Sequence, residues 1–166
     1  MINLATDEAV ENHGDEGDKQ RLRLWLRLLK VSRYIEGELR ERLRKEYATT
    51  LPRFDVMSAL YRAEKGLKMS ELSAALMVSN GNVTGIIERL VAEGLVLREP
   101  LPGDRRVMLV LLTPEGREKF RDMALVHQGW VSELLKNINA RDAATICDIL
   151  DVKLVRTSAG REGEKE

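Results

Sequence analysis

The spacing of apolar residues along the chain predicts a mostly helical protein. Between Lys19 and about Tyr47, apolar residues recur at steps of three, four and seven, which is the spacing of one helical face. Four further apolar residues widen this stripe: Leu24, Trp25, Leu28 and Val31. A stripe this wide indicates burial on more than one side of the helix. We therefore expect the first helix to pack both in its own domain and against another chain.

Three shorter helices are expected after the long one. The first begins at Pro52, which suits a first helical turn, and ends at Gly66. The second, MSELSAALMV, has Ser70 as its N-cap. The third begins after a turn of about three residues, is capped by Ser79 and ends at Gly94. Two helices joined by a tight turn therefore precede Gly94.

The period of the pattern changes after Gly94. The segments LVLRE and RVMLVLL are strand-like, and PLPGDR between them contains turn-forming residues, so a β-hairpin with a long tip is predicted. Thr113 and Pro114 open a fifth helix, and a sixth begins near Arg141. A helix-turn-helix followed by a hairpin is the order of a winged helix-turn-helix. The expected fold class is mainly α with a small β-hairpin wing.

The domain boundaries follow from the same pattern. Residues 1–18 are acidic and aperiodic, and we expect them to form a flexible tail. Residues 48–113 should form the winged helix-turn-helix lobe, and residues 19–47 and 114–156 a helical dimerisation region. Residues 157–166 are expected to be a frayed tail.

The distribution of charge matters more than the formal net charge, which is zero. Residues 1–18 carry six acidic residues and no lysine or arginine, whereas residues 19–117 carry 19 basic and 12 acidic residues, a net charge of +7. A basic middle suits a nucleic-acid partner, and a solvated surface with an acidic tail is the alternative. No apolar run is long enough to span a membrane, and a single cysteine cannot form an internal disulfide, so a cytoplasmic location is expected.

The segment VSNGNVTGIIERL, residues 78–90, holds two glycines inside a helical pattern. A glycine in a helix interior costs about 1 kcal/mol relative to alanine. One face of this helix is apolar, formed by Val83, Ile86, Ile87 and Leu90. The opposite face is centred on Gly81, Gly85 and Glu88, where a bare surface would let the helix lie deep against nucleic acid. The alternative is close packing of the glycines on a neighbouring helix.

Polar residues surround this bare face and suit base edges or phosphates, and the helix start offers free N–H groups. The predicted hairpin tip adds two arginines that are placed to enter a minor groove, although exposed arginines are often only solvated. Asp104 would hold one of them in a fixed rotamer by a charge-assisted hydrogen bond. The candidate DNA-binding residues are Ser79, Asn80, Gly81, Asn82, Thr84, Gly85, Arg89, Asp104, Arg105 and Arg106.

The chain resembles the MarR family of bacterial transcriptional regulators over about residues 20–155. The resemblance is carried by the RL…GLV.R run that begins at Arg89, by the DRR wing motif and by LT..G at residues 112–116. It implies a homodimer of the first, fifth and sixth helices that binds a pseudo-palindromic operator in double-stranded DNA. It also implies that Arg106 enters the minor groove, that Asp104 orients it and that Arg89 lies near the DNA backbone.

The resemblance further implies a ligand-responsive repressor that a small effector releases from DNA. LPRFDVMSALYR and MVSNGNVTG also resemble a branch that controls the catabolism of aromatic acids, so an aromatic acid or aromatic acyl-CoA is the expected effector. In the family, effectors bind between the DNA-binding lobe and the dimer helices. Here that region should involve Trp25, Ser32, Arg33, Phe54, Met57 and His127. Core packing is the alternative for Trp25 and Phe54.

Other classes of function have less support in the sequence. His13 lies in the acidic tail and His127 has no Cys or Asp at ligand spacing, so no catalytic residue, metal site or cofactor is predicted. Cys147 lies on an apolar helical face, where a small buried residue is expected rather than a redox sensor. The alternative function is a winged-helix module for dimerisation or protein binding that does not contact DNA. A salt-dependent DNA-binding assay separates the two functions.

Overall fold

The computed structural model describes residues 15–159, apart from the side chains of Asn80, Arg105 and residues 152–159. The tails expected at 1–18 and 157–166 therefore lie mostly outside the described residues. The helices are α1 (Glu16–Tyr47), α2 (Leu51–Arg62), α3 (Met69–Leu76), α4 (Asn80–Ala92), α5 (Pro114–Leu134) and α6 (Ala140–Ala159). The strands are β1 (Leu67–Lys68), β2 (Val96–Leu101) and β3 (Asp104–Leu112). The chain divides into two compact units within α5, after His127.

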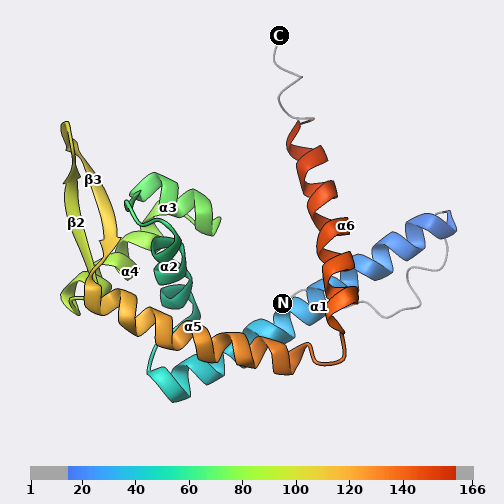
Figure 1. Cartoon of the computed structure of the whole chain (residues 1–166). Coiled ribbons are helices and arrows are strands. Elements are labelled where there is room, and N and C mark those ends of the chain that lie inside the picture. Colours follow the sequence, from blue (N-terminus) through green and yellow to red (C-terminus); the bar gives the residue numbers. More distant parts are fainter. Residues whose placement is uncertain (1–14, 160–166) are drawn as a thin grey trace, which may run out of the picture. The chain divides into compact units, whose positions relative to one another are not determined.

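The first unit contains the predicted winged helix-turn-helix. Helices α2, α3 and α4 contact one another and the sheet, and the β2–β3 hairpin projects from them (Figure 1). The three strands are antiparallel in the order β1-β3-β2. The core consists of fully buried apolar side chains from the helices and the base of the sheet: Leu43, Val56, Leu60, Leu72, Val83, Ile87, Leu90 and Val110.

Several predicted boundaries are corrected by the structure. Helix α1 begins at Glu16 and α6 ends at Ala159, so residues 16–18 and 157–159 are helical rather than parts of the tails. Helix α2 ends at Arg62, and Gly66 with φ of +80° lies in the turn before β1. The prediction that Gly94 stops α4 is confirmed, since its φ of +71° suits a glycine.

The N-cap predicted for α3 was wrong. The helix begins at Met69, two residues earlier than it would with Ser70 as its cap, and Lys68 is the capping position. The backbone N–H of Lys68 donates to the Glu71 carboxylate at 2.8 Å. This is the return half of a capping box, in which the third helical residue satisfies the backbone before the helix.

The sheet differs from the predicted hairpin in two ways. Strand β1 was not predicted, because two residues show no period. The hairpin tip is shorter than expected, since β2 and β3 extend to Leu101 and Asp104 and leave only two residues between them. Gly103 provides the turn with φ of +89°, and a register shift between Pro100 and Leu101 marks a bulge next to it.

The base of the hairpin is joined closely to the start of α5. The Thr113 hydroxyl donates to the Gly94 carbonyl oxygen at 2.8 Å and accepts from the Gly116 N–H at 3.0 Å, while the Thr113 N–H donates to the Leu95 oxygen at 3.0 Å. A Cβ added to Gly116 would lie 2.0 Å from the Leu95 oxygen. We call these four residues the wing joint. Only glycine fits at position 116 without moving the backbone.

The long helices carry exposed apolar side chains. On α1 these are Leu22, Leu24, Trp25, Leu26, Val31 and Tyr34, and on α6 they are Ile146, Ile149 and Leu150. Cys147 is also exposed, so its predicted burial was wrong for the single chain. Apolar residues at helical spacing with no cover in the chain indicate faces that a partner can bury. Within the described residues, no helix is long and apolar enough to cross a membrane.

Candidate nucleic-acid interface

Helix α4 presents a core face and a bare face. Val83, Ile87 and Leu90 are fully buried, whereas Gly81 and Gly85 are exposed on the opposite side. A Cβ added to either glycine would meet no atom within 4 Å. Close packing of these glycines on a neighbouring helix is therefore ruled out within the described chain. The bare face is open to a partner.

The polar residues predicted around this face lie at different depths. Ser79, Asn82, Glu88 and Arg89 are exposed, and Thr84 is half-buried. Ser79 is the N-cap in backbone conformation, and its carbonyl oxygen accepts from the Asn82 N–H at 3.2 Å. Its hydroxyl makes no capping hydrogen bond. That hydroxyl can therefore donate to an external acceptor such as a phosphate oxygen.

Ile86 departs from the predicted face. The sequence placed it with the buried residues of α4, but the side chain is half-buried. It lines a pocket together with Asn82, which is also on α4. The periodicity identified the apolar face correctly at Val83, Ile87 and Leu90, while the edge of that face is only partly covered.

Three charged residues of the wing (residues 96–112) follow the turn directly, at the start of β3: Asp104, Arg105 and Arg106. Asp104 and Arg106 are exposed, and the Asp104 Oδ1 atom accepts a hydrogen bond from the backbone N–H of Arg106 at 3.0 Å. This contact fixes the chain at the start of β3, in the manner of an Asx turn. The described contact of Asp104 is thus to the backbone of Arg106, whereas the sequence predicted a contact to an arginine side chain.

An ion pair that the sequence analysis missed connects α4 to α2. The Arg53 guanidinium donates to the Glu93 carboxylate at the end of α4, and this hydrogen bond holds the pKa of Glu93 below its usual range. Arg53 is largely buried, and its Nε atom has no hydrogen-bond partner among the described residues. The two residues are 40 positions apart, so no local spacing could have revealed the pair. It links the end of the bare-faced helix to the start of α2.

The six predicted effector residues differ in burial, and a ring contact joins two of them, Phe54 and His127. Phe54 and Met57 are buried core residues, and Phe54 stacks on His127 with ring centroids 4.4 Å apart. Burial lowers the pKa of His127, which favours the neutral imidazole. Trp25, Ser32 and Arg33 are exposed, with Trp25 at 57%, so core packing of Trp25 was wrong. None of the six lines the pocket beside α4.

Comparisons with known proteins match this architecture. The model of the MarR family matches residues 49–108. The chain is 32% identical to the multiple antibiotic resistance protein MarR of Escherichia coli over 120 residues, which is 68% of this chain and 81% of MarR. It is 29% identical over 163 residues to the transcriptional activatory protein BadR of Rhodopseudomonas palustris, covering 94% and 92% of the two chains. An uncharacterised regulator of Bacillus subtilis, YdgJ, is matched over 59% of its length with 29% identity.

A solved structure extends the match to three dimensions and to DNA. A cysteine-to-serine variant of E. coli MarR, crystallised with operator DNA, superposes with a TM-score of 0.68 and 30% identity. The match covers 85% of this chain and 99% of that one. The family consists of transcriptional regulators rather than enzymes. The winged helix-turn-helix, the wing motif and these matches agree: this chain belongs to the MarR family of transcriptional regulators.

Proposed function

We propose that this protein binds a pseudo-palindromic operator as a homodimer, with α4 in the major groove and the wing in the adjacent minor groove. The observation that carries the proposal is the bare face of α4, where two glycines leave open space while Val83, Ile87 and Leu90 are fully buried on the opposite side. A helix stripped of side chains on its outer face can approach base edges closely, and the polar residues beside it can donate and accept hydrogen bonds.

The contacts divide by role. Asn82, Thr84 and Gly85 lie where base edges would be read, and Ser79, Asn80 and Gly81 stand at the helix start, whose N–H groups suit phosphate. Arg89 would contact the DNA backbone. Arg106 would enter the minor groove, with Arg105 beside it and Asp104 holding the turn in shape. Base contacts would give the sequence specificity and phosphate contacts the register on the duplex.

Dimerisation would come from residues 19–47 and 114–156, with residues 48–113 as the DNA-binding lobe. The uncovered apolar residues of α1 and α6 support this division, because a monomer would leave Trp25 and Ile149 more than half exposed. A two-fold dimer places its recognition helices about one helical turn of DNA apart. The protein would act in the cytoplasm, where its operator lies.

Regulation is proposed to follow the repressor pattern, with a small aromatic acid or aromatic acyl-CoA releasing the protein from DNA. A relative carries the name Multiple Antibiotic Resistance Repressor, whereas BadR is named as an activator, so activation is the second candidate. Support for the expected effector region comes from the ring stack of Phe54 on His127, two of the residues expected there.

A binding titration tests the proposal. The full chain is used to select bound fragments from genomic DNA, and one selected operator is then titrated at several salt concentrations. We expect a two-fold symmetric footprint and a steep loss of affinity with salt, because each phosphate contact releases counterions. A protein that selects no sequence, or whose binding is independent of salt, would instead be a winged-helix interaction module.

A further inference from the structure

A pocket lies beside α4, apart from the expected effector region. Its volume is about 390 Å³, within the range of small-molecule sites in proteins. Five apolar residues line it: Pro52, Val56, Leu76, Val78 and Ile86. They come from α2, from the end of α3 and the turn after it, and from α4. The pocket is therefore built into the helix-turn-helix itself.

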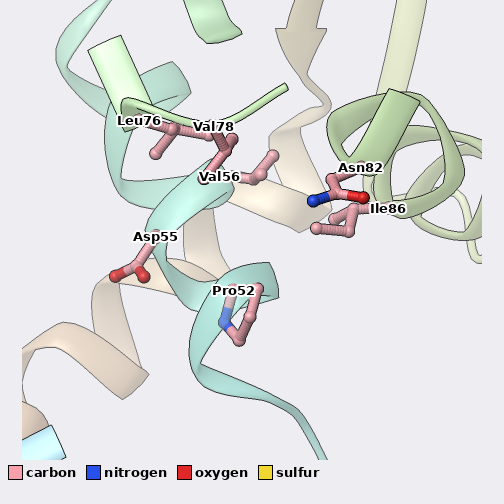
Figure 2. Close-up of a pocket in the computed structure, with 7 residues that line it drawn as sticks. All are labelled: Pro52, Asp55, Val56, Leu76, Val78, Asn82 and Ile86. Atoms are coloured by element: carbon pink, nitrogen blue, oxygen red, sulfur yellow. The ribbon is translucent and has the colours of Figure 1, made fainter. Parts of the chain in front are cut away.

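Two polar side chains complete the lining, at opposite sides. Figure 2 shows Asn82 next to Ile86 on α4, and Asp55 on α2 with its carboxylate turned outward. Asp55 is partly exposed, as are Pro52 and Val78, whereas Val56 is fully buried, so Asp55 lies at the open side of the pocket. Within the described part of the chain, no hydrogen bond or ion pair occupies the Asp55 carboxylate. An apolar wall with one unpaired carboxylate at its rim is complementary to an apolar molecule with a positive end.

The electrostatic surroundings of Asp55 also favour a positively charged ligand. Partial burial and the nearby carboxylate of Glu36 both raise the pKa of Asp55 above its usual value. The carboxylate of Glu36 acts electrostatically on Asp55, and together the two carboxylates would repel an anion placed beside Asp55. An aromatic acid, the effector expected from the family resemblance, is thus poorly suited to this pocket.

We propose that this pocket binds an apolar organic cation, such as an aryl-alkyl amine, with its apolar part against Val56 and Ile86 and its ammonium group at Asp55. The site is distinct from the expected effector region, since none of those six residues lines it. Because Asn82 and Ile86 belong to α4, a ligand in the pocket would contact the helix that we propose to read DNA and would change operator affinity. This second consequence rests on the proposed function.

Calorimetric titration of the full chain, without DNA, tests the site with three probes of one shape. These are 4-phenylbutylamine, the neutral 4-phenylbutan-1-ol and the anionic 4-phenylbutyrate. We expect the amine to bind more tightly than the alcohol, and the alcohol more tightly than the acid. Equal or tighter binding of the acid, or no binding of any probe, would overturn the proposal.

Variants locate the bound amine. Asp55→Asn should weaken amine binding about fivefold, as for the loss of a partly exposed charge pair, and leave alcohol binding unchanged. Glu64→Gln is the matched control, because it removes an exposed acid outside the pocket and should not alter amine binding. Val78→Phe should fill the pocket and abolish binding of the amine and the alcohol, with thermal unfolding used to confirm that it folds. If Asp55→Asn and Val78→Phe both bind the amine as tightly as the wild type does, the ligand lies elsewhere and the proposal is overturned.

The coupling to DNA is measured separately. The amine should change the operator affinity of the wild type and have no effect on the Val78→Phe variant. If the unliganded protein binds no operator at all, the proposed function fails while the calorimetric result on the pocket stands. If the operator binds and the amine has no effect, the pocket is occupied without influence on α4, and the second consequence is wrong.

Discussion

Gly85 is the residue at which recognition by α4 can be tested most directly. A leucine there meets no atom of the folded chain, and it is a better helix former by up to about 1 kcal/mol, so Gly85→Leu should fold with equal or higher stability. The added side chain would stand between α4 and the groove. Operator affinity should fall to the non-specific level, typically about a thousandfold or more below specific binding. A gel-shift titration with specific and scrambled DNA measures this.

Gly85→Ala is the control for this substitution. Its single methyl group should raise stability in the same way and weaken operator binding far less than leucine does. Normal operator binding by Gly85→Leu would mean that another face of the lobe contacts DNA, and that the two glycines have a different purpose.

Asp104 and Arg106 form the second test at the scale of single residues. Arg106→Ala should weaken operator binding by about 1–3 kcal/mol if the arginine makes a groove contact. Asp104→Ala should also weaken binding, although it removes a negative charge near DNA, because the backbone contact at 3.0 Å is lost. Asp104→Asn keeps a carbonyl oxygen that can accept from the Arg106 N–H, and should retain most of the affinity.

A double-mutant cycle at fixed salt decides between the roles of Asp104. Tighter binding by Asp104→Ala than by the wild type would show that its charge, rather than its support of the turn, dominates. Simple addition of the two losses would mean that Asp104 acts on something other than Arg106. If Asp104→Asn binds as poorly as Asp104→Ala, the charged carboxylate itself is needed, as the sequence first suggested.

At the scale of elements, the wing joint makes a prediction about stability. Gly116→Ala would bring a Cβ to 2.0 Å from the Leu95 oxygen, so α5 or β2 must shift. We expect a loss of about 1–3 kcal/mol in the free energy of unfolding, the usual range for an overpacked site. Urea denaturation measures it, with Gly85→Ala as the helical control that should gain stability. If Gly116→Ala loses no stability, the backbone at the wing joint can shift at little energetic cost.

The elements that the sequence predicts well are those fixed by local physics. Gly94 ends α4 because few other residues tolerate its positive φ, and Val83, Ile87 and Leu90 repeat at the period of a buried helical face. The motif residues Asp104 and Arg106 were placed correctly at the turn for the same reason, since the hairpin signal is local. Each of these features is determined by residues that lie close to it in the sequence.

The features that the sequence did not predict depend on distant partners. Strand β1 exists only because Leu67 and Lys68 pair with β3. The tight contact of Gly116 depends on the Leu95 oxygen, and the Arg53–Glu93 pair joins two helices. The pocket beside α4 combines three segments, and Cys147 was expected to be covered by a surface that the single chain does not supply. The spacing of residues within one segment cannot reveal these contacts, because each of them depends on a second segment.

At the scale of the whole molecule, the exposed apolar residues of α1 and α6 predict a dimer. The wild type should sediment as a dimer at micromolar concentration. Trp25→Asp combined with Ile149→Asp should give a folded monomer with weaker operator binding, because charges would replace two side chains that are more than half exposed in the single chain. Met108→Gln, at an exposed apolar residue of the wing, is the control and should remain dimeric. A stable wild-type monomer would contradict the predicted assembly.

Because the wing joint connects them closely, the start of α5 and the hairpin should rotate together as one rigid unit. From Leu112 to Asp104 the strand extends by roughly 25 Å, at about 3.3 Å per residue. A rotation of roughly 10° at the joint would therefore carry the tip through about 4–5 Å, which is most of the width of a DNA minor groove, about 6 Å. A small rotation of α5 would thus suffice to carry Arg106 out of the minor groove that we propose it enters, without any change in α4.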